Sequence, residues 1–195
     1  MVALRFLHAM MRFWRHLPNV LTALRMCAAP LTAVLILRGH YATALSAFAF
    51  AGLSDVLDGY LARRLSYATR FGIYLDPAAD KLLMLASFVT LTMIHAIPFW
   101  LTALVIARDL AIVIGVGLAR VFSLPLQVAP LNIGKASTVI QVGFVGVVLL
   151  LLALGEDQSN LVLAGAVATA AVTIASWLAY GQLWFRALAL GRRTA

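Results

Sequence analysis

The run "ASTVIQVGFVGVVLLLLALG" at residues 136–155 decides the fold class of this chain. A helix needs roughly 20 mostly apolar residues to cross a bilayer, and this run supplies them without a single charge. Residues 160–185 form a second uncharged apolar run. A transmembrane β-barrel would instead show short alternating segments, so these long runs predict an all-α polytopic membrane protein.

Outward from these two runs, the same apolar character continues along nearly the whole chain. Of 195 residues, 64% are hydrophobic and only 11% are charged, and the mean hydropathy is +0.99. We predict six transmembrane helices, at approximately residues 19–38, 41–65, 72–95, 98–120, 134–154 and 160–186. Gly39 and His40, "HAIPF" and "GEDQSN" separate the spans that we expect to be joined by short turns.

The domain organisation follows from these spans. Residues 18–190 form one six-helix domain, and residues 191–195 form a basic tail. The segment "MVALRFLHAMMRFWRHL", residues 1–17, mixes arginines with aromatic residues, which is typical of an amphipathic helix lying on the membrane surface. A frayed basic tail is the alternative for this segment.

The net charge of +8 fits membrane topology better than a nucleic-acid partner, which we do not expect. Arg38 lies alone on one side, with Glu156 and Asp157. Eleven basic residues fall on the other side: Arg5, Arg12, Arg15, Arg63, Arg64, Arg70, Arg120, Lys135, Arg186, Arg192 and Arg193. We therefore expect both termini to be cytosolic, in a bacterial-type inner or plasma membrane. The single cysteine, Cys27, cannot form an internal disulfide and lies in an apolar run, so we expect a buried thiol.

Four of the seven acidic residues lie close together, at Asp55, Asp58, Asp76 and Asp80. The first two are three residues apart and the last two are four apart, so each pair shares a helix face. The two helices are joined by a short loop, so the carboxylates can converge near the cytosolic face, where they would repel one another. Oxygen ligands of this kind favour hard cations, and four of them can hold two ions about 4 Å apart, as in phosphoryl-transfer sites.

A purely structural explanation for these aspartates is a polar network between helices or a set of helix caps. Asp76 precedes Pro77, which fits an N-cap followed by proline at the first helical position. Small residues near the aspartates favour a ligand instead, because they let a bulky group approach the backbone. Together with Arg63, whose guanidinium suits a phosphate, they predict a diphosphate site that includes Gly59, Ala62 and Gly72.

The stretch "DVLDGYLARRLSYATRFGIYLDPAAD" resembles the signature of the CDP-alcohol phosphotransferase family, D-x2-D-G-x2-A-R-x8-G-x3-D-x3-D, at all eight fixed positions. The resemblance extends to "LPNVLTALRMCAAPL" and "GKASTVIQ". It implies a six-helix membrane enzyme, usually a homodimer, that opens to the cytosol and uses two Mg²⁺ or Mn²⁺ ions. It also implies that these ions are held by Asp55, Asp58, Asp76 and Asp80.

The same resemblance implies further roles along the signature. Asp80 is the expected general base that takes a proton from the acceptor hydroxyl. The donor, CDP-diacylglycerol, is expected to contact Gly59, Ala62, Arg63 and Gly72, with Thr22 and Arg25 from the first span. Helix capping and interfacial anchoring are the alternative roles for Thr22 and Arg25.

The acceptor alcohol is less clearly indicated. Family members that use glycerol 3-phosphate (phosphatidylglycerophosphate synthases) tend to have a second arginine eight residues after the first, where this chain has Val116. They also usually have a second lysine at the position of Ser137. Arg108–Asp109 followed by Arg120 is more similar to CMP-forming cardiolipin synthases, which use phosphatidylglycerol. We therefore expect phosphatidylglycerol as acceptor, with glycerol 3-phosphate as the alternative.

Arg108 and Lys135 are the expected ligands of the acceptor phosphate. For Arg108 the reason is that an arginine inside a span is costly and usually functional. Adjacent helical residues point about 100° apart, so we do not expect Arg108 to pair with Asp109. Lys135 could instead be a topology anchor at the interface. A cation or proton transporter that uses intramembrane carboxylates, or a non-catalytic assembly protein with the same fold, remain alternative functions.

Overall fold

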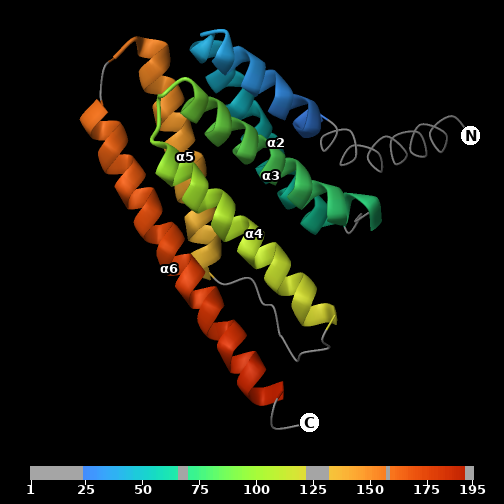
Figure 1. The fold of residues 1–195 in the computed structure, drawn as a ribbon. Helices are drawn as coiled ribbons and strands as arrows, with labels where there is room; N and C mark the ends of the chain where they lie inside the picture. Colours follow the sequence, from blue (N-terminus) through green and yellow to red (C-terminus); the bar gives the residue numbers. More distant parts are fainter. Residues whose placement is uncertain (1–23, 66–69, 122–131, 157–158, 192–195) are drawn as a thin grey trace, which may run out of the picture. The chain divides into compact units, whose positions relative to one another are not determined.

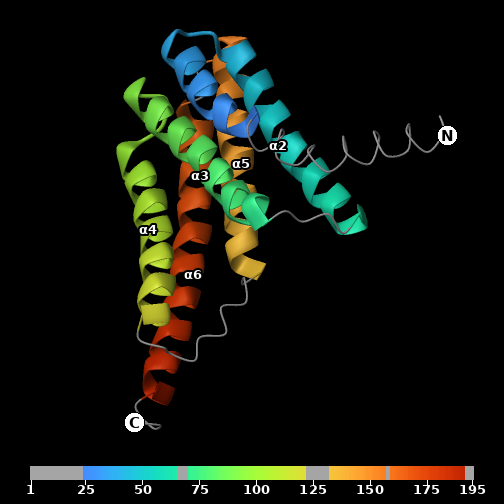
Figure 2. The same cartoon turned by 90° about the vertical axis from the view of Figure 1, so that its right-hand side faces the viewer.

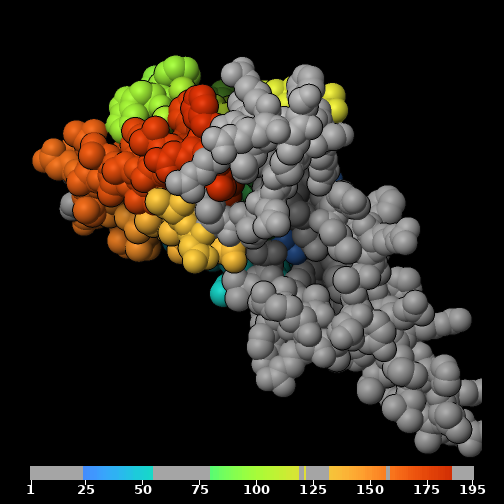
Figure 3. Space-filling view, turned by 90° about the horizontal axis from the view of Figure 1, so that it is seen from below, coloured from blue at the N-terminus to red at the C-terminus, as the bar shows by residue number. Residues whose placement is uncertain are grey.

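The computed structural model describes residues 24–65, 70–121, 132–156 and 159–191. Within these ranges, residues 55–65, 70–79, 119–120 and 186–191 are described by their backbone alone. Figure 3 shows in colour the residues whose side chains are described.

The described residues form six helical segments (Figure 1). The first is described over Leu24–Leu37. The others are α2 (Tyr41–Leu65), α3 (Arg70–Met93), α4 (Phe99–Val121), α5 (Asn132–Leu154) and α6 (Ser159–Gly191). Each segment coincides with one predicted span, so the all-α prediction is confirmed.

Three of these helices are long and apolar enough to cross a membrane by length and composition: Phe99–Leu118, Asn132–Leu154 and Ser159–Phe185. Leu24–Leu37 and Tyr41–Ser54 are apolar but shorter. Leu24 is the first described residue and Ser54 is the last residue of α2 whose side chain is described, so these two ranges do not give the full lengths of the apolar stretches. Six complete spans therefore stay a prediction.

The same turn geometry ends three of the helices. Gly39, His95 and Gly155 have left-handed φ angles of 75°, 59° and 71°. At each turn the left-handed residue donates its N–H to the carbonyl three residues earlier, and the next residue donates to a carbonyl five residues earlier. This is the Schellman motif, which satisfies the last carbonyls of a helix. The predicted separators at Gly39, His95 and Gly155 are confirmed as turns.

The chain divides into two compact units. The first contains residues 1–90 and 152–155, and the second contains residues 91–151 and 156–195. In the first unit, the helix at Leu24–Leu37 buries a stripe formed by Arg25, Ala29, Thr32 and Ile36. Cys27 lies off that stripe and is exposed, so the expectation of a buried thiol was wrong.

The second unit is built around α4, α5 and α6. Figures 1 and 2 both show α4 beside α6, and Figure 3 shows adjoining surfaces of α5 and α6. Their buried apolar side chains include Leu101, Phe144 and Leu149. A Cβ atom on Gly165 would lie 3.0 Å from the ring of Phe144, so the absence of a side chain there lets α5 and α6 pack closely.

Candidate functional site

The signature residues lie on α2 and α3, as predicted. Asp55 and Asp58 are on α2, and Asp76 and Asp80 are on α3. Because α3 begins at Arg70, Asp76 and Pro77 lie inside the helix and not at its start. The alternative role of Asp76 as an N-cap was therefore wrong, since α3 starts six residues earlier.

Most side chains of the predicted metal and donor site lie outside the described side chains, so their convergence stays a prediction. These are the side chains of Asp55, Asp58, Ala62, Arg63 and Asp76; Gly59 and Gly72 are placed by their helices alone. Thr22 lies outside the described residues altogether. Among the side chains that are described, no group of three or more potential metal ligands occurs.

Asp80 is the one signature aspartate whose side chain is described, and it pairs with Arg25. Nη1 of Arg25 donates a hydrogen bond to Oδ1 of Asp80 over 2.8 Å. The side chain of Arg25 is only 1% exposed, whereas that of Asp80 is 42% exposed. The guanidinium stabilises the negative charge of Asp80 in a position that a ligand can still reach. The structure thus brings together two predicted site residues 55 positions apart, Arg25 from the expected donor contacts and Asp80, the expected general base and metal ligand.

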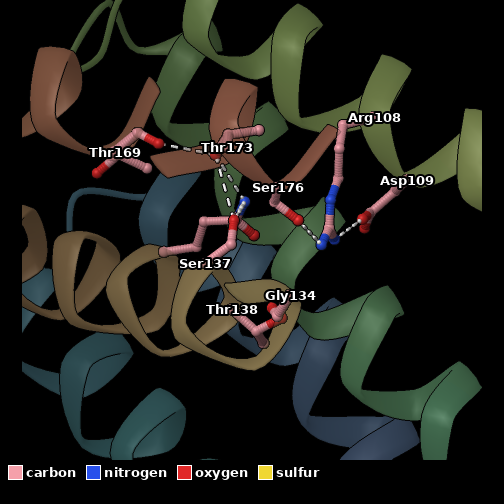
Figure 4. Close-up of polar contacts among 9 residues, drawn as sticks. Arg108, Asp109, Gly134, Ser137, Thr138, Thr169, Thr173 and Ser176 are labelled. Atoms are coloured by element: carbon pink, nitrogen blue, oxygen red, sulfur yellow. Dashed lines mark hydrogen bonds and ion pairs between the residues drawn. The ribbon is translucent and has the colours of Figure 1, made fainter. Parts of the chain in front are cut away.

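Arg108 is held by two partners inside the second unit (Figure 4). Nη1 donates to Oδ1 of Asp109 over 2.8 Å, and Nη2 donates to Oγ of Ser176 on α6 over 2.7 Å. The expectation that Arg108 would not pair with Asp109 was wrong. The long arginine side chain can bend toward its neighbour, so the angle between adjacent Cα–Cβ directions does not prevent the contact.

Two further residues complete the surroundings of Arg108. Its guanidinium carbon lies 5.9 Å from the ring centre of Tyr180, within the range of a cation–π contact. A Cβ atom on Gly134 would lie 3.4 Å from Nη2 of Arg108 and 3.0 Å from the Tyr180 hydroxyl. The glycine therefore lets the first turn of α5 approach Arg108. Lys135, the next residue, is exposed.

Arg108 is almost completely buried, at 5% exposure. Among the contacts of the described part of the chain, its Nε atom has no hydrogen-bond partner. A buried donor without an acceptor is costly, and the cost is relieved when an anion binds. This geometry fits the predicted role of Arg108 in binding an acceptor phosphate.

A buried polar seam joins α5 to α6 next to Ser176 (Figure 4). Nε2 of Gln141 donates to Oγ1 of Thr173 over 3.1 Å and to Oγ of Ser137 over 3.3 Å. Thr173 in turn donates to the carbonyl of Thr169 over 2.7 Å. Ser137 is 1% exposed and Thr173 is fully buried. The seam satisfies polar groups that would be costly to expose to lipid.

The sequence interpretation missed Ser176, Tyr180, Thr173 and Gln141. A signal for them exists, because Thr169, Thr173, Ser176 and Tyr180 follow one another at steps of four, three and four residues. Polar residues at helical spacing in an otherwise apolar span indicate one face that meets other polar groups. The spacing predicts the face, but not which partner it meets.

The comparisons with known proteins identify the family. The sequence profile of the family described as "CDP-alcohol phosphatidyltransferase" matches residues 15–181. A probable CMP-forming cardiolipin synthase of Drosophila melanogaster is 35% identical over 147 residues, which is 67% of this chain and 45% of that protein. The CMP-forming cardiolipin synthase of Streptomyces coelicolor is 38% identical over 128 residues, 63% of this chain and 59% of that protein.

A relative with another printed activity is similar as well. The CDP-diacylglycerol–glycerol-3-phosphate 3-phosphatidyltransferase of Pseudomonas fluorescens is 42% identical over 103 residues, 50% of this chain and 52% of that protein. The chain therefore matches about half of the length of these relatives. Since the family profile covers most of the chain, including every signature position on α2 and α3, this protein belongs to the CDP-alcohol phosphatidyltransferase family.

Proposed function

We propose that this protein transfers a phosphatidyl group from CDP-diacylglycerol to a hydroxyl of phosphatidylglycerol, giving cardiolipin and CMP. Membership of the phosphatidyltransferase family supports the reaction class and disfavours the transporter and assembly alternatives. Relatives with two different acceptors are similar to this chain, so the choice of acceptor rests on its own residues.

The surroundings of Val116 and Ser137 are the observation that carries the choice of acceptor. Glycerol 3-phosphate users tend to have basic residues at both positions. Here Val116 lines an apolar pocket, and Ser137 is buried in a neutral hydrogen-bonded seam. Neither environment suits a cation. A phosphodiester carries less negative charge than the phosphomonoester of glycerol 3-phosphate, so it needs fewer cationic partners.

Asp80 is the proposed general base. It would accept the proton of the acceptor hydroxyl while that oxygen bonds to the β-phosphorus, and the bond from this phosphorus to CMP breaks. Arg25 would orient the Asp80 carboxylate through the ion pair described above. The donor would contact Gly59, Ala62, Arg63, Gly72 and Thr22, and Arg25 would lie on the donor side.

A pair of Mg²⁺ or Mn²⁺ ions is part of the proposal. The set of four carboxylates at Asp55, Asp58, Asp76 and Asp80 fits hard divalent cations by its chemistry. When bound, such ions neutralise charge on the diphosphate and on the departing CMP. The partial exposure of Asp80 is compatible with this role.

Arg108 would bind the acceptor phosphate through its Nε–H, for which the described residues provide no acceptor, with Lys135 as a second cation. Asp109, Ser176 and Tyr180 would hold the guanidinium in place. We further propose that the protein acts as a homodimer in a bacterial-type plasma membrane, with its site and both termini cytosolic.

Purified protein with CDP-diacylglycerol and Mg²⁺ or Mn²⁺ tests the proposal. Phosphatidylglycerol, glycerol 3-phosphate, inositol and serine are supplied separately, and CMP release is measured. We expect release with phosphatidylglycerol. Release with glycerol 3-phosphate alone would establish the alternative acceptor, which the Pseudomonas relative supports. No release with any acceptor, together with cation flux in vesicles, would favour a transporter.

Replacement of a signature aspartate tests the proposed metal-ligand role. Asp58→Asn should lower CMP release to less than roughly one hundredth, because loss of a metal ligand exceeds the 10–100-fold effect of a group that only orients one. The thermal transition should be retained. Glu156→Gln, which removes a carboxylate outside the signature, is the control and should keep full activity. Full activity of Asp58→Asn would contradict the metal role.

A further inference from the structure

An apolar pocket lies between α4 and α6 within the second unit. Its volume is about 380 Å³. It is lined on α4 by residues between Ala111 and Leu118, with the exception of Val113 and Gly117, and on α6 by five residues between Trp177 and Trp184. Ile114 and Leu118 are 57% and 43% exposed, so the pocket opens at the surface of the protein. A cavity of this size is large enough for part of a small-molecule ligand.

Two glycines and two tryptophans shape the pocket. A Cβ atom on Gly115 would lie 2.6 Å from Nε1 of Trp184, so the indole rests directly against the backbone of α4. A Cβ atom on Gly181 would meet nothing within 4 Å, so this glycine leaves open space. Trp177 and Trp184 provide large apolar walls on the α6 side. The space thus arises from the missing side chain at Gly181 and from the position of Trp184.

The surroundings of the pocket indicate what fills it. Both walls belong to helices that can span a membrane, Phe99–Leu118 and Ser159–Phe185. An opening on such helices faces hydrocarbon, so its natural occupant is an acyl chain. Arg120 follows Leu118 by two residues on α4, and Arg186 follows Trp184 by two residues on α6. Both helices therefore carry a positive charge just beyond the same end of the pocket, and such charges attract anionic lipid headgroups.

We propose that the pocket between α4 and α6 binds one acyl chain of an anionic diacyl phospholipid, whose phosphate lies at the end marked by Arg120 and Arg186. This site is additional to the proposed reaction, because its binding residues are outside the proposed metal, donor and acceptor ligands. Tyr180 links the two, since it lines the pocket and also contacts Arg108.

Tryptophan fluorescence provides the test, because two of the four tryptophans line the pocket. The full chain with Trp14→Phe and Trp100→Phe is reconstituted in phosphatidylcholine vesicles, so that emission comes from Trp177 and Trp184. A small fraction of the lipid is replaced by brominated phosphatidylglycerol or by brominated phosphatidylcholine. We expect brominated phosphatidylglycerol to reach half-maximal quenching at a mole fraction on the order of tenfold lower than brominated phosphatidylcholine does. The reason is the attraction between its anionic headgroup and the two nearby arginines. No CDP-linked donor is present, so no lipid is consumed during the measurement, and the variants below distinguish the pocket from the proposed acceptor site at Arg108.

Two glycine variants test whether the lipid that quenches the tryptophans lies in the pocket. A Cβ atom at Gly181 meets nothing within 4 Å, so Gly181→Leu should place its side chain in the pocket and abolish the preference for the anionic lipid. Gly117→Leu is the matched control and should keep the preference. A Cβ atom at Gly117 also meets nothing within 4 Å, and Gly117 does not line the pocket. Arg186→Gln should weaken the preference while leaving quenching by phosphatidylcholine unchanged.

Three outcomes would overturn the proposal. These are equal quenching by the two lipids, an unchanged preference in Gly181→Leu, or loss of the preference in Gly117→Leu. A pocket occupied by a second copy of the chain would give equal quenching by both lipids that falls as protein density in the membrane rises.

Discussion

Two arginines inside the apolar helices show how a charged side chain is accommodated in an apolar interior. Arg25 and Arg108 are both almost fully buried, and each donates to a carboxylate at 2.8 Å. A buried guanidinium without such a partner would be strongly unfavourable. The partner of Arg25 is 55 residues away, whereas that of Arg108 is its neighbour in sequence. Neither pairing could be read from spacing, because spacing does not show how a long side chain bends.

The Arg25–Asp80 pair should contribute measurably to stability. Arg25→Gln is expected to lower the free energy of unfolding by about 1–2 kcal/mol, below the upper range for charged hydrogen bonds because Asp80 is partly exposed. Thermal unfolding in detergent measures the loss. A double-mutant cycle with Asp80→Asn isolates the coupling, and a coupling of zero would contradict the contact.

At the scale of helices, glycines control how closely the elements approach. The Cβ positions of Gly115, Gly134 and Gly165 lie within 3.0 Å of side-chain atoms on α5 or α6, whereas Gly117 and Gly181 have open space. Helix association in membranes depends on such close contacts, because lipid is as apolar as the helix surfaces. The sequence shows every glycine but not which of them face a neighbouring helix.

Two alanine substitutions on α4 should therefore have opposite effects. Gly115→Ala should destabilise the protein by roughly 1–3 kcal/mol, because its Cβ would lie 2.6 Å from the Trp184 indole. Gly117→Ala should be neutral or stabilise by up to about 1 kcal/mol through helix propensity. Thermal unfolding of the two variants side by side measures the difference, and equal effects would contradict the packing of α4 against α6.

The turn at His95 is a position where glycine would suit the backbone but another residue is present. His95 adopts a φ of 59° that glycine takes at Gly39 and Gly155. His95→Gly should raise the free energy of unfolding by about 1 kcal/mol, since a left-handed conformation costs other residues 1–2 kcal/mol. Gly39→Ala should destabilise for the same reason. A lower melting temperature for His95→Gly would show that the imidazole makes a compensating contact.

At the scale of the whole molecule, the distribution of charge predicts the orientation in the membrane. Along the sequence, eleven basic residues flank the predicted spans on one side, whereas Arg38, Glu156 and Asp157 flank them on the other. By the positive-inside rule we expect the basic side to face the cytosol.

Single cysteines test this orientation in a Cys27→Ser chain. A membrane-impermeant maleimide should label Ser66→Cys from the cytosolic side and Glu156→Cys from the opposite side. Intact spheroplasts and inverted vesicles provide the two sides, and labelling of both cysteines from one side would contradict the predicted topology.

The sequence by itself determined the helical class, the helix positions to within a few residues, the turns and the family signature. These features depend on hydropathy, glycine positions and spacing along the chain, which are local properties. Only the tertiary structure decided that Arg25 meets Asp80, that Ser176 and Tyr180 surround Arg108, and that α4 and α6 enclose a pocket. Such contacts join residues tens of positions apart, because they depend on which helix faces pack together, and a one-dimensional pattern does not contain that choice.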